Sequence, residues 1–491
     1  MHDHTGNVRM TRLFRSHDKV RVVYTITVFV VLSSLDNAAI ALYPVLTNVM
    51  AADLGEDKAG VALLTALIIL VTALTAVGWG YLGDRSRRKP LLFWATLAWS
   101  GGLLLAAGSD SLAELALWSV LVGVGLGAIA SVGFSMISDF IPPARRGLAM
   151  SFWGLSQGAG GFLGILVGGV LGASDWRRPF VGLALIGAAV ALLYLTTAEA
   201  HRGRAEPELA EALAAGGTYE YRIERSDIRK LIGIRTNPWL VLQGLTAQLA
   251  YGSLVWVPFL YQSKVEADGY DLATATAVGA VFGAIFQLGG VASILAGHLG
   301  DRLQHRTARA RAAISATGVL GAIPFFVAFF FIPLRGLDIP TDQGSITIVL
   351  ATLGSVVTNP YAASAFLLCL VAVVLTSADS PNWFALISDV NLPEHRGTVF
   401  GIANLSNGVS RAAGNGLTVP VAGLLAASFA APLNYAIGLA LFQVFFIPTG
   451  LCYWMASRTC PGDIARVRTV LAERGHRALG RTPGPVDETP G

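Results

Sequence analysis

The stretch GYLGDRSRRKP, residues 80–90, sets the membrane orientation of this chain and occurs a second time. It follows a long apolar run and places four basic residues directly behind Asp84, a pattern typical of a short cytoplasmic loop between two membrane helices. Its core, Gly-x-Leu-Gly-Asp-Arg, returns in GHLGDRLQHR, residues 297–306. The sequence therefore indicates two copies of one membrane unit.

A second repeated segment supports the duplication. DFIPPARRGLAMSFWGLS from Asp139 and DVNLPEHRGTVFGIANLS from Asp389 align without a gap at a shift of 250 positions. In this alignment Asp139 falls on Asp389 and Arg146 falls on Arg396. We therefore expect two halves of similar structure.

The composition indicates an integral membrane protein. Of 491 residues, 54% are hydrophobic and 13% are charged, against about 25% charged in typical soluble domains. The three cysteines, Cys369, Cys452 and Cys460, fit neither a disulfide framework nor a zinc spacing, so no metal or other cofactor is expected. The sequence pI is about 9.0, but the basic residues flank the apolar runs, so we expect no nucleic-acid partner. Arginine is far commoner than lysine, which favours a bacterial origin.

Twelve apolar runs are long enough to cross roughly 30 Å of hydrocarbon. We place them at 20–48, 59–83, 90–109, 112–138, 147–171, 178–197, 238–262, 273–300, 310–333, 361–388, 397–428 and 432–457. The predicted fold is an all-α membrane protein with twelve transmembrane helices in two six-helix halves. Its expected parts are an N-terminus (1–19), a first half (20–197), a linker (198–236), a second half (237–457) and a tail (458–491).

The charges of the loops predict the orientation. Most Lys and Arg residues fall in alternate loops, which places both termini in the cytoplasm of a multi-pass plasma (inner) membrane protein. Residues 335–360 have no counterpart in the first half, and we expect an external loop there. The second part of the linker, TYEYRIERSDIRKLIGIR, is compatible with an interfacial helix and equally with a solvated linker.

The twelve runs and the repeated Gly-x-Leu-Gly-Asp-Arg loop resemble the major facilitator superfamily of secondary transporters. ISDFIPPARRG, the glycine-rich segment that follows it and DWRRPF from Asp175 resemble its Spinster-like group. The resemblance implies the major facilitator fold and alternating access. It also implies a small organic substrate that is amphipathic or lipid-like, because animal members of the group move sphingosine phosphate and lysolipids.

The repeated motifs predict a cytoplasmic gate. Asp84 ends the second span, and we expect it to reach the start of the eleventh span near Arg396 and Gly397, where free amide groups favour an anion. Asp301 is expected to do the same at the start of the fifth span. The alternative is that these charges serve only orientation and loop folding. The candidate gate residues are Asp84, Arg85, Arg88, Asp139, Arg146, Asp301, Asp389 and Arg396.

Three charged residues lie within predicted spans: Asp36, Asp379 and Arg411. An ionisable group in the hydrocarbon zone is costly unless it faces a cavity or a partner, so each is a functional candidate. We predict Asp36 and Asp379 as proton-coupling residues and Arg411 as the contact for an anionic head group. The alternative is a permanent ion pair between Arg411 and one aspartate. The predicted substrate-binding residues are Asp36, Asn37, Trp383, Asn404, Asn407, Arg411 and Asn415.

The functional hypothesis is a monomeric, proton-coupled secondary transporter, with the proton gradient as energy source and the lipid bilayer as surroundings. A proton-coupled drug or metabolite exporter (an antiporter) is the alternative within transporters. A non-transporting membrane sensor or scaffold is the alternative of another class. The chain has no GxxxxGK[ST] motif and no recognisable catalytic triad, so we expect neither ATP-driven pumping nor enzyme activity.

Overall fold

The computed structural model describes residues 16–56, 58–172, 175–198, 202–215, 221–224, 226–271, 274–275, 278–279, 281–282, 288–340 and 345–479. Within these ranges the chain is helical and contains no strand. This agrees with the predicted all-α class. The predicted segments include the N-terminal 15 residues, part of the eighth span and the end of the tail, which lie outside the described residues.

The first half contains six spans. They consist of α2 (Ser16–Leu54), α3 (Lys58–Arg85), α4 (Arg88–Ala106), the sequence α5 (Leu112–Ala128), η1 (Ile129–Gly133) and α6 (Phe134–Phe140), then α7 (Arg146–Leu171) and α8 (Arg177–Leu195). A short 3-10 turn, η2 (Pro143–Arg145), leads into α7.

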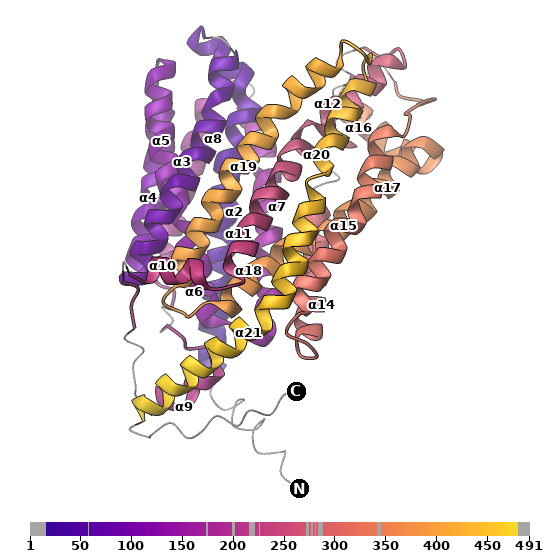
Figure 1. The fold of residues 1–491 in the computed structure, drawn as a ribbon. Helices are drawn as coiled ribbons and strands as arrows, with labels where there is room; N and C mark the ends of the chain where they lie inside the picture. The colour runs from indigo at the N-terminus through magenta and orange to yellow at the C-terminus, as the bar shows by residue number, and fades with distance from the viewer. Residues whose placement is uncertain are drawn as a thin grey trace.

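The second half follows the same plan with more interruptions. Its elements are α11 (Asn237–Ser253), η4 (Leu254–Trp256), α12 (Val257–Ala267), α14 (Leu288–Gln304), α15 (Ala310–Phe331), α16 (Ser345–Thr358), α17 (Pro360–Thr376), α18 (Asp379–Val390), α19 (Arg396–Leu425), α20 (Leu433–Gln443) and α21 (Phe446–Ala478). In Figure 1, α4, α5 and α8 lie on one side, α14, α15 and α17 lie on the other, and α2, α7, α11 and α19 lie between them.

The fourth and tenth spans are interrupted at equivalent places. The π-helical turn η1 begins at Ile129, and the break between α17 and α18 ends at Asp379, which aligns with Ile129 at the shift of 250 positions. Irregular turns inside membrane helices often occur at functional sites. The duplication therefore extends to the positions where the helices are irregular.

Seven helices among the described residues are long and apolar enough to cross a membrane by length and composition. They correspond to predicted spans 1, 2, 4, 6, 9, 10 and 12. The other five are short, interrupted, rich in polar residues or glycine, or partly outside the described residues. Span 11, for example, contains Arg411 and three asparagines.

The expected external loop at 335–360 is wrong in part, because α16 occupies residues 345–358. Its polar residues Thr352 and Ser355 are buried, whereas Leu350, Leu353 and Val357 are 62%, 49% and 86% exposed. This inverted pattern is typical of a helix that faces lipid. Fourteen residues extend about 21 Å, which is too short for a full crossing and explains why no span was predicted there.

The linker and the end of α21 gather at one end of the bundle, at the bottom of Figure 1, which we call the linker end. The linker contains η3 (Pro207–Leu209), α9 (Ala210–Ala214) and α10 (Asp227–Gly233). Leu209 packs with Val467 and Leu471 of α21, which continues as one helix past Pro461. The first part of the linker is therefore packed against the protein and is not a free tether.

Candidate functional site

At the linker end, Asp84 of α3 contacts the start of α19. Its Oδ1 accepts a hydrogen bond from the Gly397 amide at 3.1 Å, and its Oδ2 accepts from the amide and the hydroxyl of Thr398 at 2.6 and 2.8 Å. Since α19 begins at Arg396, these amides have no partner within their own helix, and the positive end of the helix dipole favours the carboxylate. The contact predicted between the second and eleventh spans is confirmed.

Asp301 of α14 makes the equivalent contact in the other copy. Its Oδ1 accepts from the Gly147 amide and its Oδ2 from the Leu148 amide, both at 2.8 Å. α7 begins at Arg146, so these amides also belong to a helix start. Each half therefore offers one aspartate to the other half, and the second predicted contact is also confirmed.

Glycines on both helices allow this contact: Gly80 and Gly297, the first glycines of the repeated motif, face Gly397 and Gly147 at the helix starts. A Cβ atom added to Gly397 would lie 2.9 Å from the carbonyl oxygen of Gly80, and one added to Gly147 would lie 2.7 Å from that of Gly297. Both distances are below those of ordinary Cβ contacts. The helix pairs α3 with α19 and α7 with α14 can approach this closely only because glycine stands at both crossing points.

A set of buried ion pairs surrounds the two crossings; we call it the linker-end cluster. Its members are Arg88, Asp139, Arg146, Glu206, Asp301, Arg311, Asp389 and Arg396. Arg88 pairs with Asp139, and Arg396 lies 3.5 Å from Asp139. Arg146 pairs with Asp389 at 2.9 Å and with Glu206. Arg311 pairs with Asp389 and, at 2.7 Å, with Asp301.

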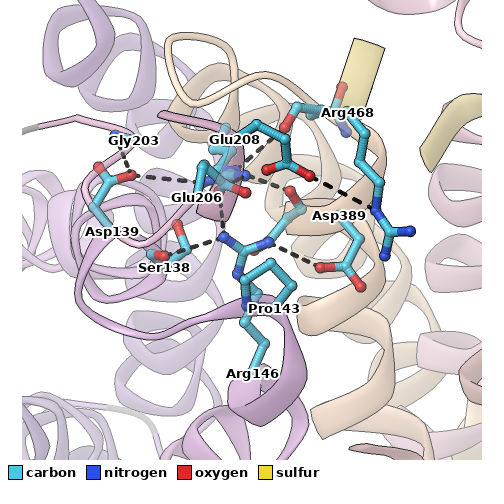
Figure 2. A network of polar contacts seen from close by, with 12 residues as sticks. Ser138, Asp139, Pro143, Arg146, Gly203, Glu206, Glu208, Asp389 and Arg468 are labelled. Atoms are coloured by element: carbon cyan, nitrogen blue, oxygen red, sulfur yellow. Dashed lines mark hydrogen bonds and ion pairs between the residues drawn. The ribbon is translucent and has the colours of Figure 1, made fainter. Parts of the chain in front are cut away.

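Figure 2 shows the part of this cluster around Arg146, whose guanidinium lies between Glu206, Asp389 and the carbonyl of Ser138. The side chains of Arg146, Arg311 and Arg396 are at most 1% exposed. Removing one partner of such a buried pair typically costs about 3–5 kcal/mol, because the other charge stays buried without compensation. Each of these buried charges is therefore compensated only while its partner stays in place.

Three members of this region were not predicted, and one predicted residue lies outside it. Arg311, Glu206 and Arg202 were missed, since Arg311 lies in a span and the other two lie in the linker, outside both repeats. A basic residue at the start of the ninth span was the available signal for Arg311. Arg85 is exposed and donates to the Tyr81 hydroxyl at 3.0 Å, so it does not join the cluster.

Asp36 is buried in α2 with no partner. It is 4% exposed, and neither carboxylate oxygen has a hydrogen-bond donor among the described residues. The neighbouring Asn37 donates to the carbonyl of Ser33 at 2.8 Å, within its own helix. An ionised carboxylate without partners is costly at such a position, so Asp36 requires a proton or a ligand.

Asp379, in contrast, is fully engaged within the second half. Its Oδ1 accepts from Gln243 at 3.0 Å and from the Tyr453 hydroxyl, and its Oδ2 accepts from the Tyr251 hydroxyl at 3.1 Å. These donors belong to α11 and α21, so Asp379 joins three helices where the tenth span is interrupted.

Arg411 lies near the middle of α19 and is exposed. It forms no ion pair or hydrogen bond with any described residue. The alternative of a permanent pair between Arg411 and an aspartate is therefore wrong for this structure. An exposed guanidinium halfway along a membrane helix must face water, because contact with lipid would be too costly.

The other predicted binding residues are partly engaged. Asn404 donates to the carbonyl of Phe400 at 2.8 Å, and the Asn407 side-chain oxygen is buried with no hydrogen-bond partner among the described residues. The carbonyl of Asn415 accepts from Trp256 at 2.9 Å. Trp383 is 4% exposed and donates to the carbonyl of Leu240 at 3.0 Å, a packing role. No metal-binding group of three His, Cys, Asp or Glu occurs in the described part of the chain.

The profile of the Major Facilitator Superfamily matches residues 26–415, which is most of the chain. The chain belongs to the major facilitator superfamily. Solved members of the superfamily have the same fold. A bacterial homologue of the human lysosomal transporter Spinster, in an inward-facing and unoccupied conformation, gives a TM-score of 0.55 at 19% identity over 90% of this chain and 98% of that one. The proton:xylose symporter XylE gives a TM-score of 0.61 at 15% identity over 89% and 96%.

Among curated relatives, this major facilitator protein is similar to spinster homologues. It is 30% identical to human protein spinster homolog 1 over 56% of this chain and 53% of the relative. It is 27% identical to the sphingosine-1-phosphate transporter SPNS2 of Xenopus tropicalis over 55% of this chain and 53% of the relative. The chain thus spans about half the length of these relatives. The Spinster-like resemblance of the sequence motifs is supported.

Proposed function

We propose that this protein is a secondary active transporter that moves an amphipathic, lipid-like molecule with an anionic head group by alternating access. Movement is coupled to protons through Asp36. The observation that carries the proposal is a pair of charges in the spans that have no partner among the described residues: Asp36 has no hydrogen-bond donor there, and Arg411 has no carboxylate there. Fixed charges without partners inside a membrane protein are typical of sites for a substrate or a coupling ion.

The chemistry of Arg411 favours an anion. A planar guanidinium can bind a phosphate or carboxylate through two parallel hydrogen bonds, and it stays charged at all physiological pH values. The relative SPNS2 is named for a phosphorylated lipid, which agrees with such a head group.

Asp379 has a different position in the proposed cycle. Since it is held by three donors, we propose that it takes up a proton only when the interrupted tenth span moves, as a second coupling residue behind Asp36. Asn407, whose side-chain oxygen has no donor in the described ranges, is proposed to contact the substrate together with Arg411.

In this proposal the linker end faces the cytoplasm of a bacterial inner membrane, both termini are cytoplasmic, and the protein works as a monomer. The closed linker end then corresponds to an outward-facing state. The gate residues at the α3–α19 and α7–α14 crossings hold that state until the substrate and proton change the balance.

The experiment is transport into proteoliposomes of the purified full-length protein. A phosphorylated sphingoid base, a lysophospholipid, a hydrophobic cation and a sugar are compared, each with and without an imposed pH gradient. We expect gradient-dependent movement of the anionic lipids, loss of it in Arg411→Ala, and loss of its dependence on the pH gradient in Asp36→Asn. Movement of the hydrophobic cation alone would favour a drug-type exporter. No movement of any compound, with both variants unaltered in ligand-induced stabilisation, would favour a sensor or scaffold.

A further inference from the structure

The linker between the halves carries one carboxylate that contacts both of them. We propose that Glu206 is a gating residue that bridges the two repeat-equivalent arginines and thereby holds the linker end closed. The inference rests on the alternating-access mechanism proposed above and extends it to a segment that belongs to neither repeat.

The geometry of Glu206 is unusual because its two partners are related by the duplication. Its Oε1 accepts from Arg396 at 2.6 Å and also from Arg146. These arginines align at the shift of 250 positions and begin α19 and α7, the two helices whose first amides receive Asp84 and Asp301. One carboxylate therefore joins the starts of both crossing helices, as Figure 2 shows for the Arg146 side.

Glu206 also contributes to the charge balance at this end. The two halves contribute four buried arginines (Arg88, Arg146, Arg311 and Arg396) and four buried aspartates (Asp84, Asp139, Asp301 and Asp389). The linker adds the positive Arg202 and the negative Glu206. Without it the cluster would bury one uncompensated positive charge, which is costly away from water. Loss of the Glu206 charge alone therefore unbalances the closed arrangement.

The linker segment around Glu206 is attached to both halves. Arg202 donates to the carbonyl of Gly83 at 2.5 Å and to that of Ser86 at 3.0 Å, and the Gly203 amide donates to Asp139 at 3.0 Å. Leu209 packs on α21 of the second half. If the halves separate at this end, Glu206 must release at least one arginine. Release of the linker is therefore part of opening.

Glu206 stays charged at every physiological pH. Burial by itself would raise its pKa, but the Arg146 and Arg396 guanidinium groups outweigh burial and lower the pKa to about 2. The bridge is consequently not a pH switch. Its function is to set the balance between the closed and open linker end.

The test compares Glu206→Gln with Glu208→Gln, a matched control two residues away. Among the described residues Glu208 forms an ion pair with the exposed Arg468, at 4.0 Å, and it forms no ion pair with Arg146 or Arg396. Spin labels on Ser86→Cys and His305→Cys, both exposed at the linker end of different halves, report the separation in nanodiscs. The three native cysteines are buried, so labelling is specific.

We expect Glu206→Gln to raise the open population about tenfold or more, which corresponds to 1.4 kcal/mol. Glu208→Gln should leave it unchanged, and Glu206→Asp should restore part of the closed population. The double variant Glu206→Gln/Arg396→Gln removes one negative and one positive charge, so the net charge of the cluster stays the same and a folding defect from an unbalanced charge is avoided. Its linker end should still be open, because the Glu206 bridge is absent.

An unchanged distance distribution in a folded Glu206→Gln protein would overturn the inference. A double variant that stays closed would also overturn it, because the opening by Glu206→Gln would then result from net charge and not from the lost bridge. The variant Asp84→Asn distinguishes an error in the role of Glu206 from an error in the proposed alternating-access gate. If Asp84→Asn opens the linker end and Glu206→Gln does not, only the role of Glu206 is wrong. If neither variant changes the distances, the proposed gate itself is wrong.

Discussion

Two buried aspartates differ sharply in their surroundings. Asp36 has no donor for either carboxylate oxygen among the described residues, whereas Asp379 accepts hydrogen bonds from Gln243, Tyr251 and Tyr453. The first arrangement penalises the ionised form, and the second stabilises it. The two residues should therefore respond in opposite ways to substitution.

We predict that Asp36→Asn leaves the free energy of unfolding equal or higher at pH 7.5, because it removes a carboxylate with no compensating partner. The same change should abolish the pH dependence of transport. Thermal unfolding in detergent and flux at pH 5.5 and 7.5 measure the two effects. A large drop in melting temperature would mean that the carboxylate has a stabilising partner after all.

Tyr453→Phe should destabilise the protein by about 1–3 kcal/mol, because it withdraws one donor from the buried Asp379 carboxylate. Tyr24→Phe is the control: the Tyr24 hydroxyl bonds Thr196 at 2.8 Å in an exposed position, so its loss should cost about 0.5 kcal/mol or less. Chemical unfolding of both variants provides the comparison. Equal losses would show that the Asp379 contact contributes nothing special.

The candidate residues that could be predicted from the sequence are charged residues at positions where charges are rare. Asp36, Asp379 and Arg411 stood out because charges are rare within membrane spans. Glu206 and Arg202 did not, because charged residues are ordinary in a linker. Their positions depend on how the linker folds back onto the bundle, which no local pattern specifies.

At the scale of helices, the structure depends on close contacts at glycines. The Asp84 and Asp301 contacts exist only while α3 meets α19 and α14 meets α7 within the reach of a hydrogen bond. The motif predicted these contacts because its aspartate and the helix start complement each other electrostatically. It did not predict α16 or the π-helical turn η1, since these depend on packing.

Gly397→Ala should weaken the closed linker end, because the added methyl group would lie 2.9 Å from the Gly80 carbonyl and 2.7 Å from an Asp84 carboxylate oxygen. Gly416→Ala on the same helix is the control, since nothing lies within 4 Å of the added group. Side-specific labelling of linker-end cysteines should increase in the first variant and stay constant in the second. Equal labelling of both variants would contradict this role of the crossing.

At the scale of the whole molecule, the two halves exchange equivalent contacts across their boundary. The linker-end cluster, bridged by Glu206, joins them at the linker end, and Asp36 and Arg411, which have no partner in the described part of the chain, lie farther along the spans. In the proposed mechanism, closure and substrate binding therefore depend on different residues. Coupling between them requires movement of complete halves, as in alternating access.

The pH dependence of closure follows from Glu206. Its pKa of about 2 in the folded protein lies below the ordinary 4.5, so its contribution is complete above pH 4.5 and is lost only as the pH falls toward 2. Between pH 5.5 and 7.5 the effect of Glu206→Gln on the open population should be constant. A change of more than about twofold across that range would contradict the assignment, and spin-label distances at the two pH values measure it.

The most direct measurement is the distance between spin labels on Ser86→Cys and His305→Cys in the native background and in Asp84→Asn, Asp301→Asn and the double variant. Replacing a charge-assisted hydrogen bond by a neutral one should shift the equilibrium about tenfold per site and about a hundredfold in the double variant, because the two crossings are separate. Short distances in the native background and a stepwise growth of a longer population are the predicted result. A single unchanged distance in all four proteins would contradict closure by two equivalent latches.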